Sequence, residues 1–91
     1  MALLITYDLN KTKDYDRLID AIQAIGPSLH LLKSAWVVVT TLSAARVGEY
    51  LEDYVDADDD VFIVEITGQP ASWSDSFSEH DTIWLKQNLG K

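Results

Sequence analysis

The chain contains no cysteine, which excludes a disulfide framework, thiolate metal sites and cysteine nucleophiles. It also lacks any apolar run approaching the roughly 20 residues that a membrane-spanning helix needs. Its first residues show no basic segment followed by an apolar core and a small-residue cleavage site. We therefore expect a soluble protein that is not exported, is located in the cytoplasm and has no membrane partner.

Positive charge is scarce as well. Seven lysines and arginines stand against 15 acidic residues, which gives a net charge of -8 at pH 7. Phosphate binding depends on clustered cationic side chains, and the one locally dense group here is Lys11, Lys13 and Arg17. Nucleic acid is therefore a disfavoured partner. An acidic surface of this kind either keeps a small protein soluble or mimics nucleic acid and binds a basic protein partner.

The length allows one compact domain with a modest core, because 91 residues with 47% hydrophobic composition are too few for two domains. A domain this small buries only about two thirds of the surface of its unfolded chain. Any remaining apolar face tends to be covered by another chain. We therefore expect a homodimer.

The hydrophobic pattern predicts alternating strands and helices. Strands are predicted at residues 2–9, 28–33, 35–40 and 61–68; helices are predicted from the Thr12 cap to Ile25, over 42–55 with Ser43 as cap, and after the Ser78 cap. The order β-α-β-β-α-β indicates an α+β fold, a ferredoxin-like split βαβ sandwich with a short C-terminal helix. Its first and third strands should be central in an antiparallel sheet. Residues 1–68 form the core of this single domain, and residues 69–91 form a C-terminal arm and the short helix.

One sheet face in this arrangement has no helix from the core motif to cover it. Strands 35–40 and 61–66 are nevertheless apolar on both sides. A second subunit, the C-terminal arm with Trp73, Phe77 and Trp84, or both must lie on that face. Whether the arm packs on its own subunit or is exchanged between subunits is open.

Several short motifs resemble the small subunit family of the CRISPR adaptation machinery, which integrates spacers. They are "LITYDLNK", "HLLKSAWVV", "LSA", "VFIVEITG" and "WLKQNL", and together they extend over nearly the whole chain. The chain is most similar to short bacterial and phage proteins related to that family, some of which carry a sporulation-regulator name. It departs from the family in its strong acidity and its lack of an arginine-rich patch.

The resemblance implies a ferredoxin-like homodimer in which the aspartate that ends the first strand, Asp8, faces its twin near the two-fold axis. Some members of the family are described as metal-dependent nucleases that hold a divalent ion between these aspartates. Others serve as a structural dimer for a partner integrase. The resemblance thus favours a homodimeric interaction module, and the alternative is an endonuclease.

Asp8 is the one candidate catalytic and metal-binding residue. Two such carboxylates brought together by symmetry suit Mg²⁺ or Mn²⁺, because these cations prefer oxygen ligands. The alternative interpretation is an aspartate that starts a turn and accepts backbone N–H hydrogen bonds. We favour this structural role, since a single residue specifies a site only loosely.

The other candidates are aromatic, basic and acidic groups. Tyr7, Trp36, Trp73, Phe77 and Trp84 are expected in the core or at the dimer interface, since no cationic side chains adjoin Trp73 or Phe77 for base stacking. Lys11, Lys13 and Arg17 are candidates for contact with phosphate or with a partner. The acidic run 56–60 lacks the glycine and glutamate of an EF-hand, so we interpret it as a solvated loop.

Overall fold

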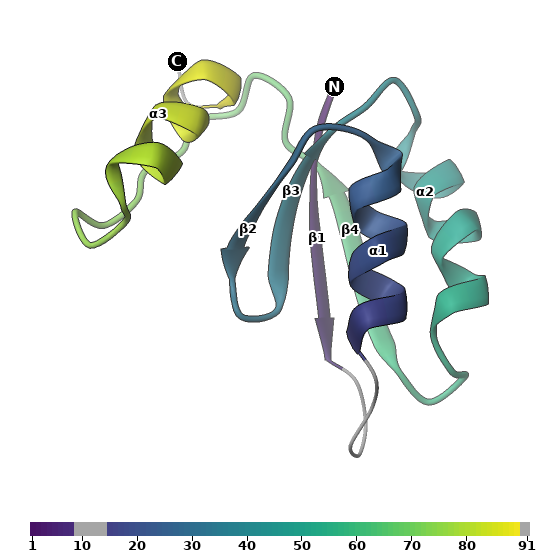
Figure 1. Ribbon diagram of the computed structural model, residues 1–91. Coiled ribbons are helices and arrows are strands. Elements are labelled where there is room, and N and C mark those ends of the chain that lie inside the picture. Colours follow the sequence, from purple (N-terminus) through teal and green to yellow (C-terminus); the bar gives the residue numbers. More distant parts are fainter. Residues whose placement is uncertain (9–14, 90–91) are drawn as a thin grey trace.

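The computed structural model describes residues 1–8 and 15–89 and has an α+β architecture. Its described elements are β1 (Ala2–Asp8), α1 (Tyr15–Ile25), β2 (Ser28–Leu32), β3 (Ala35–Val39), α2 (Ala44–Leu51), the short 3₁₀ helix η1 (Glu52–Tyr54), β4 (Asp60–Glu65) and α3 (Glu79–Asn88). No helix within these residues has the length and apolar character needed to cross a membrane. The predicted order of strands and helices is confirmed (Figure 1).

The four strands form one antiparallel sheet in the order β2-β3-β1-β4. The prediction that the first and third strands are central is confirmed. Ile5 of β1 lies between Trp36 of β3 and Ile63 of β4. The run Ala35 to Val38 is buried throughout, as an apolar strand covered on both faces should be. The sheet therefore has two edges, β2 and β4.

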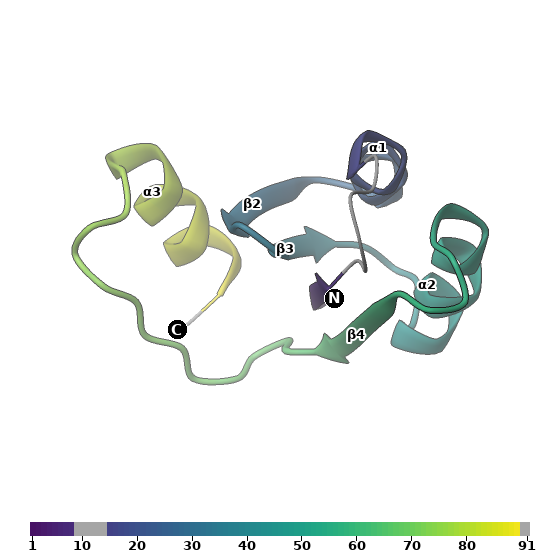
Figure 2. The same cartoon turned by 90° about the horizontal axis from the view of Figure 1, so that it is seen from below.

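The first face of the sheet is covered by α1 and α2 (Figures 1 and 2). Alternate residues of β1 point to this side, because side chains of a strand alternate between faces. They meet the apolar stripes of both helices in a first core, formed by Leu3, Ile5, Tyr7, Leu18, Ala21, Ile22, Trp36, Val38, Val47 and Leu51. No side-chain nitrogen or oxygen buried in the described part of the chain lacks a hydrogen-bond partner.

The second face is covered in part by the C-terminal segment. After β4 the chain runs along this side of the sheet, and α3 then lies beside β2 (Figures 1 and 2). A second core forms there from Ala2, Leu29, Val37, Leu85 and Leu89, with Trp73 and Trp84 packed against it. The arm of this chain thus covers part of the apolar second face, as the sequence allowed for the arm alone or for the arm together with a second subunit.

Local signals account for the helix starts. The Ser43 hydroxyl accepts a hydrogen bond from the Arg46 backbone N–H, and the Ser78 hydroxyl accepts one from the Asp81 backbone N–H, so these two predicted caps are confirmed. The third predicted cap, Thr12, lies outside the described residues. The end of α2 was predicted too late. The α-helix ends at Leu51, and residues 52–54 tighten into η1, as the last turns of helices often do.

The last strand is also shorter than predicted: it ends at Glu65 instead of residue 68. Residue 66 still donates its backbone N–H to the Ala2 carbonyl, and the Thr67 hydroxyl accepts from the Ala2 N–H. Gly68 then adopts a positive φ of 70°, which turns the chain away from the sheet. The arm begins at this turn, and residues 67–78 connect β4 to α3.

Candidate functional site

Asp8 lies at the exposed end of β1, directly opposite Asp60 of β4. Strand alternation places both carboxylates on the second face of the sheet, the side of Ala2 and Leu4. Like charges that face each other across two strands destabilise a sheet. The sequence suggested one carboxylate per chain at this position, whereas the register brings two together.

A shallow hollow of about 540 Å³ surrounds this pair. Asp8, Asp59, Asp60, Thr6 and Phe62 are among the residues that line it. Three carboxylates and a hydroxyl form an all-oxygen donor set, which is the ligand chemistry that Mg²⁺ and Mn²⁺ prefer. Within the described residues, however, the three carboxylates whose oxygens lie within 4.8 Å of one another are Asp56, Asp58 and Asp59, so Asp8 and Asp60 form a pair that is not part of a three-carboxylate cluster.

The hollow borders an apolar part of the second face that we call the Phe62 patch, formed by Leu4, Thr6, Phe62 and Val64. These residues are cross-strand neighbours in the pairs Leu4–Val64 and Thr6–Phe62. Phe62 is 64% exposed, although it sits in the middle of a strand. Leu4 and Val64 are half-buried. The second core does not extend far enough to cover this end of the face.

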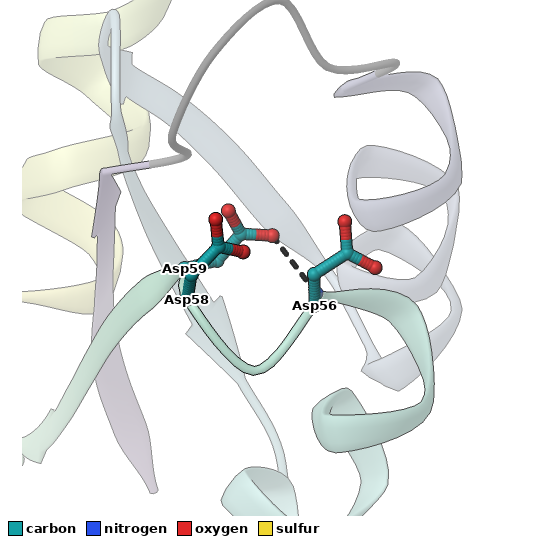
Figure 3. A group of neighbouring side chains, drawn as sticks. All are labelled: Asp56, Asp58 and Asp59. Carbon is teal, nitrogen blue, oxygen red and sulfur yellow. Dashed lines mark hydrogen bonds between the residues drawn. The ribbon is translucent and has the colours of Figure 1, made fainter.

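The acidic loop before β4 gathers three carboxylates. Oxygens of Asp56, Asp58 and Asp59 lie within 4.8 Å of one another, and the three side chains point to the same side of the loop (Figure 3). The Asp56 backbone N–H donates to the Asp59 carboxylate at 2.8 Å, and the Asp59 N–H donates to the Asp56 carbonyl at 3.0 Å. These bonds hold a tight turn, in keeping with an exposed acidic loop.

Tyr7 and Trp36 lie in the first core, where 5% and 4% of their surfaces are exposed. The Trp36 indole N–H donates to the Tyr7 hydroxyl at 3.2 Å, and the His30 ring stacks on Trp36 at 4.5 Å between centroids. Burial raises the pKa of the Tyr7 phenol, partly offset by the hydrogen bond from Trp36. Both side chains stabilise the fold beneath α1, so the interface proposed below is built from other residues.

Trp73, Phe77 and Trp84 belong to the C-terminal segment. Trp73 and Trp84 pack against the second core. Trp73 and Phe77 also line an apolar pocket of about 400 Å³ between the arm and the sheet. In this structure these aromatic side chains pack on the sheet of their own chain.

Arg17, predicted to contact phosphate or a partner, makes contacts within its own chain. Its guanidinium donates to the Asp53 carbonyl at 3.1 Å and lies 5.9 Å from the centroid of the Tyr54 ring. It thereby links α1 to η1. Lys11 and Lys13, the other two members of the basic group, lie outside the described residues.

Sequence reasoning missed Asp60 and Phe62. Asp60 was assigned to the loop, and Phe62 was one of several apolar residues in a strand with two apolar faces. Asp60, Phe62 and Val64 are spaced two residues apart, and residues with this spacing lie on the same face of a strand. This spacing could have placed Asp60 and Phe62 on one surface. Compared with protein-family models, curated proteins and solved structures, this chain matches none of them.

Proposed function

We propose that the protein is a small homodimeric interaction module of the ferredoxin-like type, in which two copies pair through their Phe62 patches. The observation that carries this proposal is the exposure of Phe62 in the middle of β4. Burial of a large aromatic side chain removes much apolar surface from water, and exposed aromatic side chains are typical of interaction surfaces.

The surroundings of Phe62 support face-to-face pairing of the sheets. Leu4 and Val64 extend the apolar surface, and Thr6 lies beside Phe62, with its hydroxyl 3.4 Å from the Phe62 carbonyl. Strand order with β1 and β3 at the centre is compatible with the ferredoxin-like type. The resemblance to the small CRISPR adaptation subunit also favours pairing near Asp8.

Light scattering during size-exclusion chromatography tests this proposal. The wild-type protein is expected at twice the mass of the chain, and Phe62→Glu is expected at the mass of one chain. Ile83→Glu is the matched control, because Ile83 is an exposed apolar residue of α3, outside the patch. A monomeric wild type, or equal loss of pairing in both variants, would contradict pairing through the patch.

A second candidate function is a divalent-metal-dependent nuclease, favoured by the Asp8–Asp60 pair. Bound there, Mg²⁺ or Mn²⁺ would supply an activated water for attack on a phosphodiester. Asp8 and Asp60 would hold the ion, and pairing of two chains near Asp8 would double the number of carboxylates. The net charge of -8 disfavours tight binding of the substrate.

Cleavage of labelled RNA and of double-stranded DNA with Mg²⁺ or Mn²⁺ tests the nuclease. Asp8→Asn and Asp60→Asn should each abolish cleavage if the pair is the metal site. Asp20→Asn removes the same charge from the exposed surface of α1 and should leave cleavage unchanged. Absence of cleavage by the wild type would leave Asp8 with its structural role.

A further inference from the structure

A groove runs between α2 and the outer edge of the sheet. Its cavity volume is about 620 Å³. Gly48 of α2 and the apolar side chains Val55, Val61 and Ile63 are among its lining residues. We call it the α2–β4 groove. It lies on the side of β4 that faces the helices, so it is separate from the Phe62 patch.

The rim of this groove is acidic. Glu49, Glu52, Asp56 and Asp59 contribute to its lining, and none of the lysine, arginine and histidine residues that the structure describes does. Glu49 and Glu52 are exposed. An apolar floor beneath four carboxylates is complementary to a segment that carries both apolar and cationic side chains.

The edge of β4 offers backbone hydrogen bonds beside this groove. The sheet ends at β4 within the part of the chain that the structure describes. Because the residue 66 N–H donates to the Ala2 carbonyl, the even-numbered residues of β4 exchange hydrogen bonds with β1. The N–H and C=O groups of Val61, Ile63 and Glu65 therefore point outward, where an extended segment can pair with them.

The charges at the ends of β4 select against a second copy of this chain. If two β4 strands paired antiparallel at this edge, the acidic rims of the two grooves and the Asp60 and Glu65 carboxylates of both copies would be brought together along one joined edge. Like charges placed opposite each other repel, and edge strands commonly use charge to prevent self-pairing. The same two carboxylates attract a strand that carries lysine or arginine.

Gly48 gives the groove its depth. A Cβ at this position would have Ile63 Cδ1 as its nearest neighbour at 3.8 Å, an ordinary contact, and Gly48 has no positive φ. Neither the available space nor the backbone conformation requires glycine at position 48. Glycine is also among the weakest helix formers, so helix stability does not account for it either. Its missing side chain leaves open the space that a partner side chain would enter.

We propose that an extended basic segment of a partner protein adds to the edge of β4 and places its side chains in the α2–β4 groove. This inference deepens the proposal of an interaction module by naming the chemistry of its partner. It uses a different surface from the Phe62 patch, so the two proposals fail separately. Every second side chain of the partner strand points to the groove side of the sheet. Along that one face, an apolar side chain contacts Val61 and Ile63 and cationic side chains face the acidic rim.

Fluorescence anisotropy with the labelled peptide Lys-Thr-Val-Thr-Lys-Thr tests the inference, because its lysines and its valine share one face of an extended strand. The peptide has six residues, the length of β4. Saturable binding is expected at low salt, and it should weaken at least tenfold as the salt concentration rises to about 0.5 M, because screening shortens the reach of the carboxylates. A control peptide with alternate N-methyl groups keeps the charge and removes the edge hydrogen bonds. Equal binding of both peptides, or no binding by the wild type, would overturn the inference.

Protein variants separate the groove from general charge attraction. Gly48→Leu, which fills the groove, should weaken binding at least tenfold while it preserves the circular dichroism spectrum and the thermal midpoint. Glu49→Gln with Glu52→Gln should weaken binding and reduce its salt dependence. Asp20→Asn with Glu79→Gln removes two charges elsewhere and should change binding less than twofold. An equal loss in this last variant would overturn the groove as the site.

Light scattering on the same samples keeps the two proposals distinct. Phe62→Glu is expected to bind the peptide whether or not it pairs with itself. Binding by a protein of single-chain mass supports the edge site and counts only against pairing through the Phe62 patch. Loss of peptide binding in a well-folded Phe62→Glu that is monomeric would show that the peptide needs the dimer interface, which contradicts the edge site.

Discussion

The two faces of the sheet are closed to different degrees. On the first face, α1 and α2 pack directly against the sheet, and ten fully or nearly fully buried residues form the first core. On the second face a single helix at the end of a long connection covers one part of the sheet and leaves the Phe62 patch exposed. The first face is thus closed by its helices, whereas the second face leaves a large aromatic side chain, Phe62, exposed.

The largest expected effect lies in the first core. Ile22→Ala removes a fully buried side chain of α1 and leaves a cavity between the helix and the sheet. We expect the free energy of unfolding to fall by about 2–5 kcal/mol. Urea denaturation followed by circular dichroism measures this value. A loss below about 1 kcal/mol would show that the first face is less tightly packed than the structure indicates.

The buried hydrogen bond of the first face should contribute next. Tyr7→Phe leaves the Trp36 indole N–H without its partner, which should cost about 1–3 kcal/mol. Because burial raises the pKa of Tyr7 in the folded state, its stabilising contribution is complete below pH 10 and is lost as the pH rises through the folded-state pKa.

The wild type should therefore lose more stability than Tyr7→Phe as the pH rises above 10, the ordinary pKa of a tyrosine. Burial also raises the pKa of Tyr50, which is unchanged in both proteins and cancels in the comparison. Denaturant titrations of the two proteins at each pH measure the difference. Parallel pH profiles would show that the Tyr7 phenol ionises equally in the folded and unfolded chains.

A smaller effect on global stability is expected from the second face. Leu85 is the one residue of α3 that is fully buried, so Leu85→Ala should release α3 from the sheet. Since the first core remains intact, we expect a loss of less than about 2 kcal/mol in global unfolding and a local loss of order. Hydrogen exchange should show faster exchange in α3 and unchanged protection in β1 and β3. Uniformly faster exchange would mean that both faces unfold as one unit.

The smallest expected effect is a gain. Gly48→Ala should raise the free energy of unfolding by about 0.5–1 kcal/mol, because alanine favours the helix and the position has room for a Cβ. Thermal denaturation measures the gain. If stability falls instead, a Cβ at Gly48 meets an obstruction, and the glycine is needed for packing.

Sequence reasoning succeeded where the controlling interactions are local. Ser43 and Ser78 cap helices through bonds to residues three positions ahead, and such spacings can be read directly from the chain. The apolar run around Trp36 likewise predicted a central strand. Both features depend on near neighbours in the sequence.

The candidate site depended on register, which the sequence does not display. Asp8 meets Asp60 because β1 and β4 pair with a particular offset, and a shift by one residue would place each side chain on the other face. The exposure of Phe62 depends in turn on how far α3 reaches across the sheet. These facts follow from contacts between residues more than 50 positions apart in the chain.

The connection between β4 and α3 affects how firmly α3 is held on the sheet. A helix joined to its docking surface by a connecting segment of the same chain meets that surface at an effective concentration on the order of millimolar. Even a weak intrinsic affinity of α3 for the second face therefore keeps it docked. Any molecule that binds the part of the sheet beneath α3 must compete with this intramolecular ligand, whereas a ligand of the Phe62 patch need not. The arm thus raises the affinity that a ligand needs in order to bind beneath α3. It does not raise the affinity that a ligand of the Phe62 patch needs.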